Sequence, residues 1–118
     1  TEVSFSKVEV NGSKELPGAE LKVVKGDKSE GEVVEKWTSG SEVHKIKLQE
    51  GTYTMVETTA PKGYEVAESI TFRVTKEGKV EVKEKDGNYV SRANSIVKME
   101  DAKTPDKPVI PEEPKATD

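Results

Sequence analysis

The chain has 118 residues, of which 19 are Lys or Arg and 23 are Asp or Glu, while only 31% are hydrophobic. A chain of this length forms one domain with a small hydrophobic core, and it has no cysteine with which to make a disulfide. Hydrophobic residues never occur more than two in a row. This excludes a transmembrane helix and the core of a signal peptide, so we expect no membrane partner.

The net charge of −4 argues against a nucleic-acid partner. Phosphate recognition needs clustered Lys and Arg, whereas here the basic residues alternate with Glu along the chain. The charge pattern is instead typical of a solvated protein surface.

Short alternating runs of apolar and polar residues predict strands, and no stretch keeps the spacing of apolar residues that marks a helix. In chain order, the expected strands are Val3–Val10, Glu20–Val24, Gly31–Trp37, Val43–Leu48, Gly51–Thr58, Ser69–Thr75, Lys79–Lys83 and Asn94–Ala102.

Turn signals separate these strands at a spacing of roughly 8–12 residues, which is typical of an antiparallel sandwich or barrel. They include Asn11-Gly12, Pro17-Gly18, Lys62-Gly63 and Asp86-Gly87. The sequence therefore predicts an all-β, antiparallel sandwich or barrel over residues 1–102.

Residues 103–118 have the composition of a spacer. Prolines recur at every third position, at Pro105, Pro108, Pro111 and Pro114, with charged residues between them. Three residues per turn is the polyproline II period, so we expect an extended linker. A Pro-rich ligand for an aromatic groove is the alternative, but no basic anchor stands beside an apolar pair, which favours the linker.

Three of the expected strands carry a charged residue at a position that, by alternation, faces the same side as their apolar residues. Because successive side chains of a strand point to opposite faces, Lys7 shares the inward parity of Val3 and Phe5. In the same way Glu57 shares the parity of Tyr53 and Met55, and Asp101 shares that of Val97 and Met99. The alternation thus directs one cation and two carboxyl groups toward the interior.

Burial favours the neutral forms of such groups, because it raises the pKa of a carboxyl group and lowers that of an amine. A neutral lysine amine is a nucleophile and a carboxyl carbon is an electrophile. We expect Lys7 and Asp101 to condense to an amide, with Glu57 shuttling protons. Two alternatives remain open on pattern alone: charges at strand ends that reach solvent, and a buried salt bridge without further chemistry.

Several motifs resemble those of collagen-adhesin B-type (CnaB-like, prealbumin-like) domains of Gram-positive surface adhesins and pilins, particularly the B-type domain of a streptococcal fibronectin-binding adhesin. They are Phe5-Ser6-Lys7, the turn from Lys14 to Ala19, the run from Gly51 to Tyr64 that contains Glu57-Thr58-Thr59-Ala60-Pro61, and the closing segment from Ile96 to Ala102. The resemblance covers the body and leaves out the tail.

The resemblance implies an all-β, antiparallel Greek-key β-sandwich of immunoglobulin-like architecture. In such domains an early lysine joins an Asn or Asp of the last strand, with a glutamate as catalyst. Matched by motif, these residues are Lys7, Asp101 and Glu57, and Asn94 is a weaker candidate acceptor. The resemblance also implies a monomeric stalk domain of an extracellular, cell-wall-anchored protein, with neighbouring domains of that protein as partners. An adhesive module that binds a host extracellular-matrix protein is the alternative.

We expect neither a metal nor another cofactor, and no enzyme activity beyond a single-turnover self-modification. His44 is the only histidine, and its lysine-flanked strand indicates a surface side chain rather than a catalytic or metal site. A bond from Lys7 to Asp101 would close a loop of about 95 residues and add roughly 4–5 kcal/mol of stability, if disulfide loop entropy transfers to it.

Overall fold

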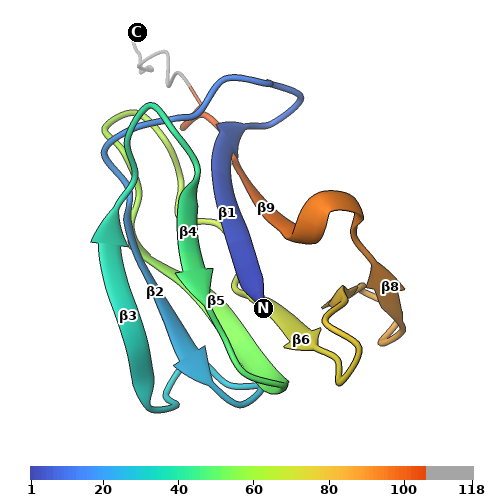
Figure 1. Ribbon diagram of the computed structural model, residues 1–118. Helices are drawn as coiled ribbons and strands as arrows, with labels where there is room; N and C mark the ends of the chain where they lie inside the picture. Colours follow the sequence, from blue (N-terminus) through green and yellow to red (C-terminus); the bar gives the residue numbers. More distant parts are fainter. Residues whose placement is uncertain (106–118) are drawn as a thin grey trace, which may run out of the picture.

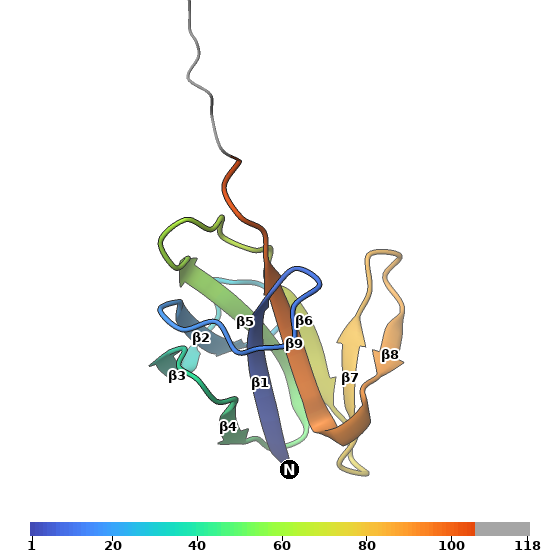
Figure 2. The ribbon, with the colours of Figure 1, turned by 90° about the horizontal axis from the view of Figure 1, so that it is seen from above.

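The computed structural model describes residues 1–105, in which two β-sheets pack face to face (Figures 1 and 2). The smaller sheet has the strand order β4-β1-β9, and the larger has the order β3-β2-β5-β6-β7-β8. The bounds are β1 (Glu2–Glu9), β2 (Glu20–Lys25), β3 (Val33–Thr38), β4 (His44–Lys47), β5 (Gly51–Thr59), β6 (Ile70–Val74), β7 (Val80–Lys83), β8 (Tyr89–Ser91) and β9 (Ile96–Asp101), with a 3₁₀ turn at Ala93–Ser95 before β9.

The predicted all-β sandwich is confirmed, and eight of its nine strands lie close to the expected ranges. Two details of the prediction are wrong. The last strand begins at Ile96 rather than Asn94, because the 3₁₀ turn occupies the two preceding residues. The sequence also gave no sign of β8, a three-residue edge strand that pairs with β7 after the Asp86-Gly87 turn.

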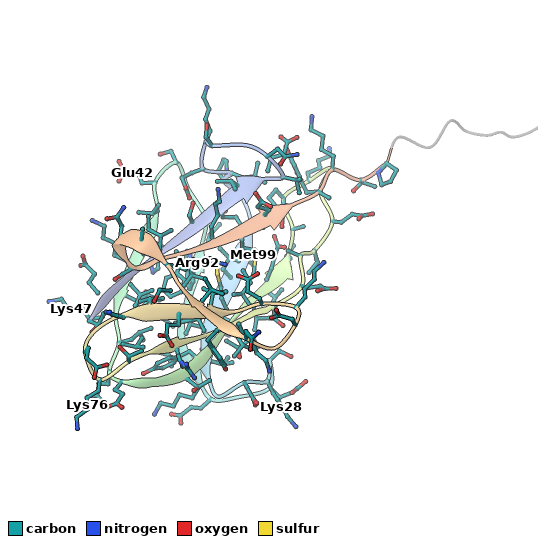
Figure 3. The ribbon with its side chains drawn as sticks, turned by 90° about the vertical axis from the view of Figure 1, so that its right-hand side faces the viewer. Lys28, Glu42, Lys47, Lys76, Arg92 and Met99 are labelled. Atoms are coloured by element: carbon teal, nitrogen blue, oxygen red, sulfur yellow. The ribbon has the colours of Figure 1, made fainter. Side chains whose placement is uncertain are left out.

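The alternation of side chains places the core between the sheets. The smaller sheet contributes Val3, Phe5, Val97 and Met99, and the larger contributes residues such as Met55 and Phe72, all at most 2% exposed. Charged side chains such as Lys28, Lys47 and Lys76 point outward, away from this core (Figure 3). No helix among the described residues is long and apolar enough to cross a membrane.

The pairing of β1 with β9 departs from the antiparallel rule that the sequence predicts. These strands are the first and the last of the body, and they lie side by side in parallel, with Phe5 opposite Val97 and Lys7 opposite Met99. Parallel neighbours need a long crossover connection, and here all the intervening strands supply it. Short-range turn signals cannot reveal a pairing of this kind.

The backbone stays paired beyond the expected domain boundary at residue 102. Lys103 forms an isolated antiparallel bridge with Tyr64, and the Thr104 N–H donates to the Gly63 carbonyl at 2.9 Å. The division into a body and a Pro-rich linker stays a prediction, since residues 106–118, which include three of the four tail prolines, lie outside the described residues.

Strand β1 changes its pairing partner halfway along. Its first half pairs with β4 from Glu2 to Phe5, and past that point the 14–16 segment takes the place of β4. The carboxylate of Glu15 accepts hydrogen bonds from the Lys7 N–H at 3.0 Å and from the Ser6 hydroxyl at 2.5 Å. The Lys7 carbonyl accepts from the Leu16 N–H at 2.6 Å, so the 14–16 segment holds both backbone polar groups of Lys7.

We predict that Glu15→Ala lowers the free energy of unfolding by about 1–3 kcal/mol, because it leaves two partly buried donors without an acceptor. Denaturant unfolding followed by Trp37 fluorescence measures the change. Lys14→Ala is the matched control, since Lys14 is exposed and a surface substitution changes stability by only about 0.5 kcal/mol. Equal stabilities of the two variants would contradict this role of Glu15.

Candidate functional site

Three ionisable side chains meet inside the sandwich, at the end of the core where its apolar residues stop. Lys7 on β1 is 1% exposed, Glu57 on β5 is 4% exposed and Asp101 on β9 is fully buried. All three point inward, as the strand alternation predicts. The smaller sheet supplies Lys7 and Asp101, and the larger sheet supplies Glu57.

The lysine contacts both carboxyl groups. Its Nζ donates to Oδ1 of Asp101 and lies 3.4 Å from Oε2 of Glu57. In the parallel register Lys7 is opposite Met99, so Asp101 lies on the same face two residues farther along β9. Long side chains can span such a diagonal between neighbouring strands, and lysine has the necessary length.

The Glu57 carboxyl group is oriented by the backbone of a later segment. Its Oε1 accepts a hydrogen bond from the Ala67 N–H at 2.7 Å. The pairing of β2 with β5 shifts register between Glu20 and Leu21, and Leu21 lies opposite Glu57. The irregularity on β5 therefore comes directly after Glu57, and the alternation of Tyr53, Met55 and Glu57 stays regular.

Burial raises the pKa of Glu57 from 4.5 to about 7, and a hydrogen bond with the Asp101 carboxyl acts in the same direction. The Ala67 N–H and the positive charge of Lys7 oppose this rise in the pKa of Glu57. Glu57 Oε2 and Asp101 Oδ2 are buried, and neither oxygen has a hydrogen-bond partner among residues 1–105.

These groups suit acyl chemistry better than metal binding. Among the described residues, no group of three or more His, Cys, Asp or Glu side chains could hold a metal ion. An amine touches one carboxyl group, and a second carboxyl group with a raised pKa lies beside both. This combination supplies a nucleophile, an electrophile and a proton donor in one buried site.

The structure keeps Asn94 away from this cluster. Asn94 is exposed in the 3₁₀ turn before β9, with a positive φ of 59°, whereas Asp101 ends β9 seven positions later. The weaker candidate acceptor is therefore not brought to Lys7.

His44 is more enclosed than a surface histidine, with 32% of its side chain exposed. Its ring stacks on Trp37 with centroids 4.4 Å apart, and its Nε2 pairs with Glu35. Because Trp37 and His44 belong to β3 and β4, the edge strands of the two sheets, this stack closes one side of the sandwich. His44 thus packs between the edges of the two sheets, a role that its lysine-flanked strand did not indicate.

Reasoning from the sequence missed the polar residues that hold the reacting strands. Glu15 binds the Lys7 backbone, and Glu9 accepts a hydrogen bond at 3.0 Å from the hydroxyl of Tyr64, 55 positions away. Glu9 shares the inward parity of Lys7 at the end of β1, which could have drawn attention to it. Its partner depends on the tertiary fold, and no spacing in the chain reveals that partner.

Comparisons with known proteins agree with this architecture. Residues 1–88 match the family model described as SpaA, prealbumin-like fold domain. The pilus tip adhesin Cpa of Streptococcus pyogenes is 39% identical over 87 residues, which are 72% of this chain but only 12% of that protein. The chain therefore spans about an eighth of the length of this relative.

Solved structures of pilus adhesins share the fold. A structure of the pilus-presented adhesin Cpa superposes with a TM-score of 0.65 at 33% identity, over 77% of this chain and 20% of that one. A C-terminal fragment of the pilus adhesin SpaC from Lactobacillus rhamnosus GG gives a TM-score of 0.61 at 26% identity, over 92% and 47% of the two chains. The resemblance to prealbumin-like domains of Gram-positive pilus adhesins is thus confirmed, and this chain belongs to the SpaA family of prealbumin-like fold domains.

Proposed function

We propose that the chain is a structural stalk domain of a bacterial surface adhesin or pilin, held together by an isopeptide bond between Lys7 and Asp101 that forms without an enzyme. Glu57 acts as the proton shuttle. The observation that carries the proposal is the burial of all three groups together, with the Lys7 amine against both carboxyl groups.

Electrostatics favours an amide over an ion pair at this position. Removing an ammonium and a carboxylate from water costs several kcal/mol per ion, and only excellent geometry offsets that cost. An amide has the same atoms less one water and carries no charge. Condensation therefore removes two buried charges and leaves a polar group that the neighbouring Glu57 can hydrogen-bond.

The reaction is balanced within the cluster. The Lys7 ammonium first gives a proton to the Asp101 carboxylate, which leaves a neutral amine and a carboxylic acid. The neutral Nζ then attacks Cγ of Asp101, the Nζ–Cγ bond forms, and one Cγ–Oδ bond breaks. The oxygen leaves as water with two hydrogens, so an ammonium and a carboxylate become one amide and one water. Glu57 donates its proton to the departing oxygen and recovers one from the amine, and it ends the reaction unchanged.

The position of the bond in the fold fits a domain that carries tension. Residue Thr1 and the end of β9 lie at opposite ends of the body (Figure 2), and β1 and β9 run in parallel between them. A force applied to the two ends passes along β1 to Lys7, crosses the bond and leaves after Asp101. Strands β2 to β8 lie outside this path and are shielded from the load.

The location and partners of the domain belong to the same proposal. The relatives are pilus adhesins, which supports exposure of this domain on the outside of the cell. In the proposed role, the domain belongs to a surface protein that is anchored to the cell wall, and its partners are the neighbouring domains of that protein. Binding of a host extracellular-matrix protein by this domain stays a prediction.

The first test is the intact mass of the chain under denaturing conditions. We expect a mass lower than that of the sequence by one water, because the amide persists when the fold is lost. Lys7→Ala, Asp101→Ala and Glu57→Ala are each expected to have the full mass, since each removes a reactant or the proton shuttle.

Exposed residues of the same strand provide matched controls. Lys98 and Glu100 are exposed on β9, so Lys98→Ala and Glu100→Ala should still lose one water. A wild-type chain with its full mass after folding would overturn the cross-link and leave a buried salt bridge as the role of the cluster.

The second prediction concerns pH. A carboxyl group with a pKa of about 7 is mostly protonated below that pH and mostly ionised above it. Because the reaction needs the protonated form of Glu57, the rate of bond formation should fall as the pH rises through about 7. A chemically synthesised chain, diluted from denaturant and sampled by mass spectrometry over time, gives this rate at each pH.

Glu57→Gln is the control for the pH profile, because glutamine keeps the size of the side chain but cannot titrate. Loss of a positioned proton donor slows a reaction by about 10²- to 10⁴-fold, and the fall near neutral pH should disappear in this variant. A wild-type rate that rises through the same pH range would contradict the assignment of Glu57 as the acid.

A further inference from the structure

A short segment after β5 contacts two of the strands that carry the reacting groups, β1 and β5, and the residues that directly follow the third strand, β9. It comprises residues 63–67 and follows a tight turn in which the Tyr64 N–H donates to the Pro61 carbonyl at 3.0 Å. Gly63 has a φ of 89° in this turn, a value that glycine adopts without steric cost. The turn therefore gives the segment a defined starting direction.

The backbone of the segment holds the chain directly after Asp101. The Glu65 N–H donates to the Ala102 carbonyl at 2.9 Å, and the Gly63 carbonyl accepts from the Thr104 N–H at 2.9 Å. Tyr64 and Lys103 form a bridge between these two bonds. The end of β9, and with it the position of Asp101, is thus fixed from the segment.

The same segment reaches the other two strands. Its last residue, Ala67, donates its N–H to Glu57 on β5. The Tyr64 hydroxyl donates to Oε1 of Glu9 at 3.0 Å. Glu9 lies two residues after Lys7 on β1 and directly opposite Asp101 in the register of β1 with β9.

The hydrogen bond between Tyr64 and Glu9 is suited to holding the 63–67 segment against β1. It joins a neutral donor to a charged acceptor, a kind of bond that is stronger than one between neutral groups. A tyrosine is already protonated at neutral pH, and the bond to Glu9 raises the pKa of Tyr64 further, so the phenol stays the donor. The ion pair of Glu9 with Lys103 is longer, at 3.6 Å, and its lysine is 67% exposed, so it contributes little.

We propose that Tyr64 is a positioning residue for isopeptide formation: its hydrogen bond to Glu9 fixes β1 against the segment that already holds Glu57 and the end of β9, and so aligns Lys7 with Asp101. The inference rests on the proposed function. Reacting atoms must be held in a narrow range of geometry for a fast intramolecular reaction, and this tie joins the strand of the nucleophile to those of the other two groups.

The experiment separates folding from bond formation in one refolding reaction. Chemically synthesised full-length chain, which has never folded, is diluted from denaturant into buffer. Trp37 fluorescence reports folding, and intact mass reports the loss of water. In Tyr64→Phe we expect folding of normal amplitude. Bond formation should then be slower by about 3- to 10-fold, because the variant loses part of the free energy of one hydrogen bond to a charged group.

Substitutions of Glu9 distinguish positioning from a general loss of stability. Glu9→Gln keeps an oxygen that accepts from Tyr64 but loses the charge that strengthens the bond, so its rate should lie between those of the wild type and Glu9→Ala. Glu9→Ala should be as slow as Tyr64→Phe. Because both residues act through one hydrogen bond, the double variant Glu9→Ala/Tyr64→Phe should be no slower than either single variant. Tyr89→Phe, which removes the hydroxyl of the tyrosine on β8, is the matched control and should react at the wild-type rate.

The possible failures are distinguishable. A wild-type chain that folds without losing water overturns the proposed function itself. If the wild type loses water and Tyr64→Phe forms the bond at the same rate once folded, the positioning role alone is overturned. Additive slowing in the double variant would also overturn it, because two independent structural effects add.

Discussion

The burial of one amine between two carboxyl groups is the constraint on which the rest of this structure depends. Lys7, Glu57 and Asp101 are almost completely removed from solvent, and an isolated charge in such a place is costly. The raised pKa of Glu57 shows one response of the protein, which is to neutralise a carboxyl group with a proton. In the proposed function, amide formation would neutralise the other two groups for the same electrostatic reason.

Two strands far apart in sequence create this cluster. Because β1 and β9 pair in parallel, inward-facing residues near their ends lie side by side, and Lys7 reaches Asp101 across a diagonal of the sheet. An antiparallel arrangement would bring the beginning of one strand beside the end of the other. The pairing of β9 with β1 is therefore a condition for the proposed bond, which could form only after folding.

Much of the site could be predicted from single strands, because the inward parity of Lys7, Glu57 and Asp101 is a local property of each strand. The positions of most strands were predictable for the same reason. The parallel pairing of β1 with β9 was not, since it depends on contacts across nearly the whole chain. Strand β8 was also missed, because three residues at a sheet edge, with Val90 43% exposed, show no alternation between core and solvent.

The polar residues around the cluster explain how a small hydrophobic core can hold reacting groups in register. Along their own strands, Phe5, Met55 and Met99 are the last inward-facing apolar side chains before the three charges. Beyond that point Glu15 holds the Lys7 backbone, and the 63–67 segment holds Glu57 and the chain after Asp101. Directional hydrogen bonds fix relative positions more narrowly than non-directional apolar contacts do. The high content of charged residues thus serves the interior as well as the surface, because a few of these residues are the partners that order the reacting end of the sandwich.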